Sequence, residues 1–265
     1  MNILNRPYPL SSEQLNFYRE NNFIKIKQVL DAATIDRFNE VISEQVSLIS
    51  TEKRKLEDRD TYGKAFLQLF NLWQINDTIK NLVFSKRLAG IAATLMEVEG
   101  VRLYHDQALF KEAGGGITPW HADQYYWPLA TERTITAWIP LQETPLDMGP
   151  LEFSAGSHRI LEGRELAISD ESEQKIAKQL RINNFPLIAE AFDIGEVSFH
   201  SGWVFHRAGA NQSQQMRKVM TIIYMDKEMR LKAPENSGQQ ADRETWCPGA
   251  SIGEIIDTPL NPILI

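Results

Sequence analysis

The chain of 265 residues contains a single cysteine, Cys247, which excludes an internal disulfide and favours a reducing compartment. It has no run of 18 apolar residues, and its first residues lack the apolar stretch of a signal peptide. Clustered basic residues are missing as well: the net charge is −7, and the basic triplet at 53–55 is interleaved with acidic side chains. We therefore expect a cytoplasmic protein with neither a membrane nor a nucleic-acid partner. The sequence leaves the oligomeric state open.

Histidine is also scarce, with five in the chain, and one of them lies two residues from an aspartate. His121 and Asp123 belong to the segment P-W-H-A-D-Q-Y-Y-W at 119–127. In an extended segment, residues i and i+2 point to the same face. One imidazole and one carboxylate on one face are two of the three ligands of a facial triad for non-haem iron. Because such a pair also arises by chance, the prediction requires a third ligand.

Three later histidines are candidates for that third ligand: His158, His200 and His206. His158 lies in the turn-like sequence G-S-H-R, where a surface role is the simpler interpretation. The other two share the segment F-H-S-G-W-V-F-H-R, and Arg217 follows His206 by eleven residues. A guanidinium on a neighbouring strand suits the far carboxylate of an iron-bound 2-oxo acid, since its planar fork forms two parallel hydrogen bonds. This pairing favours His206, and His200 remains the alternative.

Hydrophobic periodicity divides the chain into a helical part and a strand-rich part. Ser11 and Asp31 are predicted helix caps, and a third helical pattern runs over 86–97. From Val101 onward the apolar residues alternate as in strands, and strand patterns recur at 134–141, 151–153, 196–199 and 216–225. Gly and Pro turns separate these short strands, which favours a jelly roll or cupin-like barrel.

We predict a single α+β domain over residues 1–265 with a mainly β core. The core, at about 100–226, is expected to be a double-stranded β-helix with the N-terminal helices packed outside it. Residues 160–192 are more polar and partly helical, and we interpret them as an insertion between strands. No internal repeat or linker divides the chain.

Several longer motifs resemble one family. W-H-A-D, T-A-W-I-P-L, G-P-L-E-F-S-A-G-S-H-R and F-H-S-G-W-V-F-H-R-A-G-A-N, followed by Arg217, are similar to the phytanoyl-CoA dioxygenase (PhyH) family of Fe(II)/2-oxoglutarate oxygenases. The resemblance implies that His121, Asp123 and His206 bind Fe(II) and that Arg217 binds 2-oxoglutarate. It further implies that Trp138 borders the co-substrate and that Lys64 lies near it.

Other residues are expected around this site. Gln107 lies on the strand before the Gly114–Gly116 loop and is predicted to line the site, while the loop itself is flexible enough to close over it. Many family members have Ser two places after the last histidine, where this chain has Ala208, so one co-substrate contact is either absent or replaced. Four aromatic residues flank the ligand motifs and either line a substrate pocket or pack in the core: Tyr125, Tyr126, Trp127 and Trp203.

The resemblance implies a dioxygenase that uses O2 and 2-oxoglutarate to oxidise a C–H bond of a small-molecule substrate, releasing succinate. Related halogenases replace the metal carboxylate with Ala or Gly, and the presence of Asp123 therefore predicts a hydroxylase. The absence of a basic entrance favours a free small metabolite over a coenzyme A thioester. The alternative is a non-catalytic, cupin-like protein that binds a metal or a small molecule.

Overall fold

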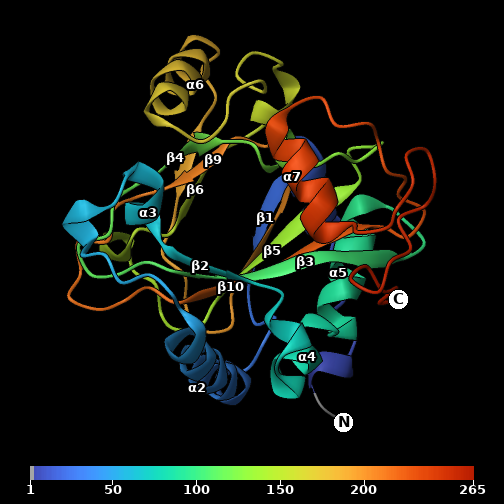
Figure 1. The fold of residues 1–265 in the computed structure, drawn as a ribbon, viewed down its shortest axis with the longest axis horizontal. Coiled ribbons are helices and arrows are strands. Elements are labelled where there is room, and N and C mark those ends of the chain that lie inside the picture. Colours follow the sequence, from blue (N-terminus) through green and yellow to red (C-terminus); the bar gives the residue numbers. More distant parts are fainter. Residues whose placement is uncertain (1–2) are drawn as a thin grey trace.

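The computed structural model describes residues 3–265 and contains two antiparallel sheets that face each other (Figure 1). The larger sheet contains, in spatial order, β1 (Phe23–Ile26), β8 (Val197–Ser201), β5 (Thr134–Pro140), β10 (Val219–Asp226), β3 (Val101–Phe110) and β2 (Leu67–Phe70). The smaller sheet contains β4 (Thr118–His121), β9 (His206–Ala208), β6 (Leu151–Ser154) and β7 (Leu187–Ala189). This arrangement confirms the predicted jelly roll with helices outside a β core.

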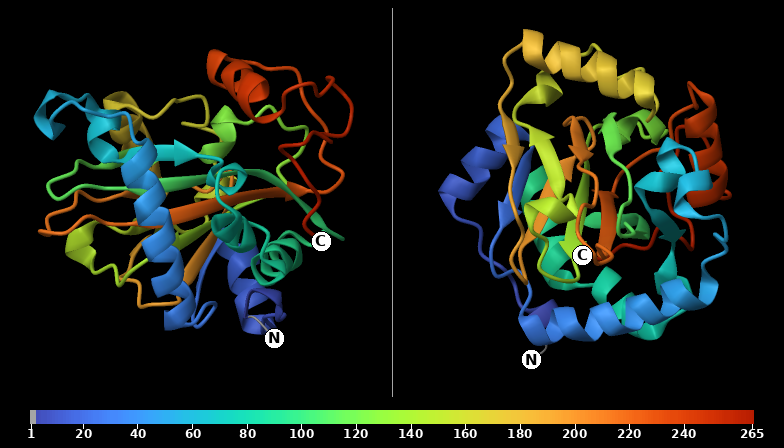
Figure 2. Two further views of the ribbon diagram at one scale, coloured as in Figure 1. Left: turned by 60° about the horizontal axis from the view of Figure 1, so that its bottom comes forward. Right: turned by 90° about the vertical axis from the view of Figure 1, so that its left-hand side faces the viewer.

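Helices of the first hundred residues cover the outer face of the larger sheet (Figures 1 and 2). They are α1 (Ser12–Asn21), α2 (Ala32–Ile49), α4 (Asp77–Val83) and α5 (Lys86–Met96). Ser11 caps α1 in a capping box with Gln14, and Asp31 caps α2, as the sequence predicts. The buried faces of α2 and α5 form one apolar core with Ala137 and Ile222 of the sheet.

Shorter helical segments lie in the connections between these elements. They are η1 (Ile3–Asn5), η2 (Leu56–Asp58), α3 (Thr61–Ala65), η3 (Leu72–Gln74), η4 (Asp123–Tyr126), η5 (Leu146–Met148) and η6 (Ser157–Arg159). A C-terminal helix that we did not predict, α7 (Ser237–Trp246), packs near η4. Strand β2 contacts α7 through the rings of Phe70 and Trp246, whose centroids lie 4.8 Å apart.

The segment 160–192, which we interpreted as an insertion, has two parts. Its helix α6 (Asp170–Ile182) packs against β4 of the smaller sheet. Its last part forms β7, which pairs with β6 and belongs to the sheet itself. The inserted structure therefore ends before Leu187.

Alternation along β5 explains which of its side chains face the cavity between the sheets. Ile135, Ala137 and Ile139 point outward and join the core under the helices. Thr136 and Trp138 point inward, because successive residues of a strand face opposite sides, and both line the cavity. Within residues 3–265, no helix is both long enough and apolar enough to cross a membrane.

Candidate active site

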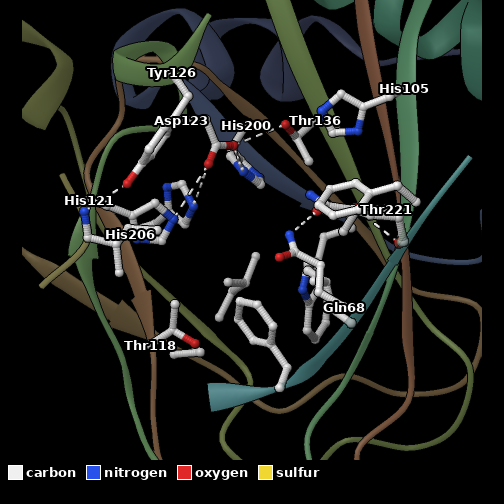
Figure 3. A pocket seen from close by; sticks show the side chains of 18 of the residues that line it. Gln68, His105, Thr118, His121, Asp123, Tyr126, Thr136, His200, His206 and Thr221 are labelled. Carbon is white, nitrogen blue, oxygen red and sulfur yellow. Dashed lines mark hydrogen bonds and ion pairs between the residues drawn. The ribbon is translucent and has the colours of Figure 1, made fainter. Parts of the chain in front are cut away.

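Two histidines and an aspartate come together at the smaller sheet (Figure 3). His121, at the end of β4, lies directly opposite His206 in the antiparallel pair of β4 and β9. Ala122 is extended, with φ −124° and ψ 127°, so Asp123 points to the same side as His121. One ligand atom from each of the three side chains lies within 4.8 Å of the others.

Local hydrogen bonds orient both imidazoles toward this cluster. Nδ1 of His121 lies 2.7 Å from the carbonyl oxygen of Pro119, and Nδ1 of His206 lies 3.1 Å from that of Val204. A carbonyl oxygen only accepts, so each Nδ1 carries the hydrogen and each Nε2 keeps a free lone pair. Both rings therefore present the nitrogen that a metal binds, as metal-bound histidines do elsewhere.

The carboxylate of Asp123 is held by two further side chains of the larger sheet. Thr136 Oγ1 donates to Oδ2 over 3.2 Å, and His200 Nε2 lies 3.3 Å from the same oxygen. Burial opposes the charge of Asp123, but the neighbouring His206 and the hydrogen bond from His200 keep its pKa well below the usual range. The alternative ligand His200 thus orients the carboxylate, and the geometry favours His206 as the third ligand.

A cavity of about 250 Å³ lies beside the cluster, between the sheets (Figure 3). One end contains a buried arginine, Arg217, beside Trp138. The other end is lined by aromatic rings and one further carboxyl group, Asp242. The two ends have different chemistry, which suits two different ligands.

The arginine end has unpaired buried donors. Arg217 is almost fully buried, its Nη1 donates to the carbonyl oxygen of Gly149, and its Cζ lies 5.6 Å from the centroid of the Trp138 ring. Its Nε has no hydrogen-bond partner among the described residues. Burial lowers the pKa of Arg217 to about 9, so the guanidinium stays charged at neutral pH. A buried cation with a free donor fits the far carboxylate of 2-oxoglutarate.

Thr118 provides a hydroxyl group close to Ala208, where many family members have a serine. Thr118 of β4 lies directly opposite Ala208 of β9, and both line the cavity. The buried hydroxyl of Thr118 has no partner within residues 3–265. It offers, from the adjacent strand, the kind of hydroxyl group that many family members have two places after the last histidine.

Lys111 lies next to Arg217 in the structure but has other contacts. The backbones of the two residues form an isolated antiparallel bridge. Nζ of Lys111 donates to the carbonyl oxygens of Gly116 and Gly209 over 2.6 and 2.7 Å. Burial, followed by the charge of Arg217, lowers the pKa of Lys111 to about 6. Arg217 is therefore the cation that is available to a dianionic co-substrate.

Two further residues predicted near the co-substrate have different positions. Gln107 lines the cavity, and its Oε1 accepts a hydrogen bond of 2.5 Å from Gln68 Nε2. The side chain of Lys64 is not part of the cavity wall. Its backbone carbonyl instead accepts from the N–H of Gly116, over 2.8 Å.

The glycine loop is hydrogen-bonded to the segment that follows β9. Gly114 donates to the carbonyl oxygen of Asn211, and Asn211 donates back to Gly115, each over 2.9 Å. A side chain at Gly115 would place Cβ 2.7 Å from Lys111 Cγ, so this glycine permits the close approach of the two segments. The loop is accordingly a support for Lys111 in this structure.

The four flanking aromatic residues separate into two groups. Tyr126 and Trp127 line the cavity, as expected. Tyr125 and Trp203 do not line it and lie instead along a surface groove, which Trp127 also reaches. Trp203 stacks there with Arg164, whose Cζ is 4.4 Å from the ring. The turn of η4 explains why Tyr125 and Tyr126 differ, because consecutive residues on a 3-10 helix point in different directions.

The aromatic end of the cavity contains residues that sequence reasoning missed. They come from α3, β2 and α7, far from the ligand motifs in the chain: Tyr62, Phe66, Phe70, Asp242 and Trp246. The Phe70 and Trp246 rings lie 4.8 Å apart, and Trp246 lies 4.7 Å from the ring of His105. The cluster of aromatic residues around 62–70 was the one available signal in the sequence.

A jelly roll with two histidines, an aspartate and a buried arginine around one cavity defines a 2-oxoglutarate-dependent, non-haem iron oxygenase. The chain belongs to the phytanoyl-CoA dioxygenase (PhyH) family, whose model matches residues 18–219. This confirms the resemblance seen in the sequence motifs. Iron and 2-oxoglutarate are accordingly its cofactor and co-substrate.

Similar proteins share the fold over nearly the whole chain. A protein of Stutzerimonas stutzeri, described as a probable alpha-ketoglutarate-dependent hypophosphite dioxygenase, is 22% identical over 230 residues, covering 80% of this chain and 78% of its own. The carbocyclase SnoK from nogalamycin biosynthesis is 24% identical, with a TM-score of 0.76 and coverage of 98% and 99%. The epimerase SnoN, in complex with Fe3+, alpha ketoglutarate and nogalamycin RO, is 21% identical, with a TM-score of 0.79 and coverage of 96% and 98%.

Proposed function

We propose that this protein oxidises a C–H bond of a small organic metabolite, with hydroxylation as the default outcome and with conversion of 2-oxoglutarate to succinate. The iron and its co-substrate supply the activation of dioxygen that an unreactive C–H bond requires. The residues of the chain bind these groups, orient them and keep water away. In this proposal residues 1–265 act as one domain.

Each proposed role follows from a contact described above. His121, Asp123 and His206 hold the iron, and the hydrogen bonds to Asp123 keep its carboxylate in one orientation. Arg217 pairs with the far carboxylate of 2-oxoglutarate, and Trp138 borders the same end of the cavity. Retention of Asp123 as a ligand leaves no position for a halide once co-substrate and oxygen are bound, which supports hydroxylation.

One observation carries the proposal: free metal ligands and an incompletely paired buried guanidinium share a single cavity. A purely structural role leaves the free lone pairs of His121 and His206 and the unpaired Nε of Arg217 without an explanation. A non-catalytic metal-binding protein needs the cluster but has no use for Arg217 beside it.

The walls of the cavity support an organic substrate. Its outer half is lined by rings, including Tyr62, Phe70, Tyr126 and Trp246, and apolar walls with a few polar groups are typical of small-molecule sites. No lysine lines the cavity in the described chain, which argues against a phosphate-rich substrate such as a coenzyme A thioester.

The test uses the purified protein with Fe(II) and 2-oxoglutarate under anaerobic conditions. A weak visible charge-transfer band is expected, and it should be absent from His206→Ala and present in His158→Ala, a matched variant away from the cluster. Admission of oxygen with a panel of candidate metabolites should then give substrate-dependent succinate. A colourless mixture and no succinate with any compound would favour the non-catalytic binding protein.

A further inference from the structure

The outer half of the cavity contains a carboxyl group with no basic partner. Asp242 lies on α7 and lines the cavity, where its Oδ2 accepts a hydrogen bond of 3.1 Å from the hydroxyl of Tyr104. Within residues 3–265 no arginine or lysine forms an ion pair with Asp242. Burial raises the pKa of Asp242 to about 7, as expected for an acid without a compensating charge.

Asp242 and Arg217 lie near opposite ends of strand β3. Tyr104, which contacts Asp242, is near the start of β3, and Lys111, which pairs with Arg217, directly follows its end. Seven residues of extended chain correspond to roughly 20 Å. Arg217 is therefore too far away to neutralise Asp242, and it is committed to the co-substrate in the proposed function.

The charges of the loaded site leave Asp242 without compensation. A divalent iron and Arg217 together balance Asp123 and a dianionic co-substrate. Among the described residues that line the cavity, Arg217 is the one permanent cation. The carboxyl group of Asp242 then remains for the third molecule that must enter the cavity, which is the substrate, and a cationic group bound there would favour its ionised form.

Aromatic rings beside Asp242 favour the same kind of ligand. Trp246, one turn further along α7, packs against Phe70 and His105 at centroid distances of 4.8 and 4.7 Å. Trp127 and Tyr62 line the same cavity. The faces of such rings attract cations, most strongly where water is excluded, as in the aromatic cages that bind substituted ammonium groups.

We propose that Asp242 and the adjacent rings bind a positively charged amine of the substrate, so that this oxygenase acts on an amine-bearing organic molecule. The inference rests on the proposed function and names the substrate class for the same cavity. Asp242 holds the ammonium, Trp246 and Phe70 cover its hydrocarbon neighbours, and the C–H bond to be oxidised faces the His121–Asp123–His206 cluster.

The experiment compares matched amines and alcohols as ligands. A panel of arylalkyl amines, such as 2-phenylethylamine, is titrated beside the corresponding neutral alcohols, such as 2-phenylethanol, and binding is followed by tryptophan fluorescence. At least one amine is expected to bind about tenfold more tightly than its alcohol. Asp242→Asn, which keeps the shape and the bond from Tyr104, should abolish the preference, and Asp242→Glu should restore it.

Glu244→Gln provides the matched control, since Glu244 is exposed on the same helix and should leave the preference unchanged. The proposal is overturned if no amine in the panel binds better than its alcohol, or if the preference survives in Asp242→Asn. If Asp242→Asn fails to fold, the comparison of amine and alcohol binding by the wild-type protein tests the proposal by itself. The titrations are made with Ni(II) and 2-oxoglutarate bound, so that Asp123 is neutralised as in the loaded site. Because fluorescence needs no turnover, failure of the amine site is distinguishable from failure of oxygenase activity, which the Fe(II) charge-transfer band and succinate release report.

Discussion

Replacement of Arg217 by lysine should weaken 2-oxoglutarate binding strongly while leaving the iron cluster intact. The guanidinium is almost fully buried, and Nη1 is already used by Gly149, so the remaining nitrogens form the fork for the co-substrate. Lysine offers one point charge in place of two parallel bonds. Loss of one charge-assisted hydrogen bond costs about 1.5–3 kcal/mol, which corresponds to a KM for 2-oxoglutarate raised about 10- to 100-fold.

The new ammonium has a second disadvantage at this position. Burial already lowers the pKa of neighbouring Lys111 to about 6, and a lysine at 217 would experience the same environment. The assay is succinate release against 2-oxoglutarate concentration, supported by anaerobic titration of the visible band. Arg133→Lys is the control, because Arg133 is exposed and pairs with Asp226. An unchanged KM for Arg217→Lys would refute the assignment and would mean that another basic residue binds the far carboxylate of 2-oxoglutarate.

Three further outcomes are expected. His206→Ala should lose most Fe(II) affinity and all turnover, with a normal circular-dichroism spectrum. His200→Ala removes a hydrogen-bond partner of Asp123 and should lower Fe(II) affinity about 10- to 100-fold in metal titrations. If His200→Ala had the larger effect, His200 would be the ligand. Saturation with Ni(II) at about 100 times its Kd should stabilise the wild-type fold by about 2.7 kcal/mol, or roughly 5–10 °C in a thermal melt, and an equal shift in His206→Ala would place the metal elsewhere. In high chloride the native enzyme should form no chlorinated product by mass spectrometry, because Asp123 occupies the position that a halide needs.

The sequence predicted those parts of the site that depend on short stretches of chain. His121 and Asp123 share a face because the single residue between them is extended, and this needs no information beyond three residues. The preference for His206 came from its spacing to Arg217 and from the family resemblance, whereas its pairing with His121 across β4 and β9 was not predicted. Caps at Ser11 and Asp31 are equally local, since each side chain binds a backbone N–H three residues later.

The substrate end of the cavity was not predictable in this way. Phe70 reaches it through the register of β2 on β3, and Asp242 and Trp246 reach it through the docking of a mainly polar helix, α7. Both features depend on contacts between segments that are far apart in the chain. The position of Tyr125 depends on the turn of η4, which a pattern of alternating residues does not reveal, and Trp203 lies in the connection between β8 and β9.

The contacts of Asp123 also have a mechanical consequence. His121 and His206 belong to the smaller sheet, whereas Thr136 and His200, which hold Asp123, belong to the larger one. A metal ion bound by all three ligands therefore links the two sheets of the sandwich. Amide hydrogens of the short strands β4 and β9 should exchange with solvent more slowly once the metal is bound, while those of the helix-covered β10 should change little. Metal loading would then set how often the two sheets separate.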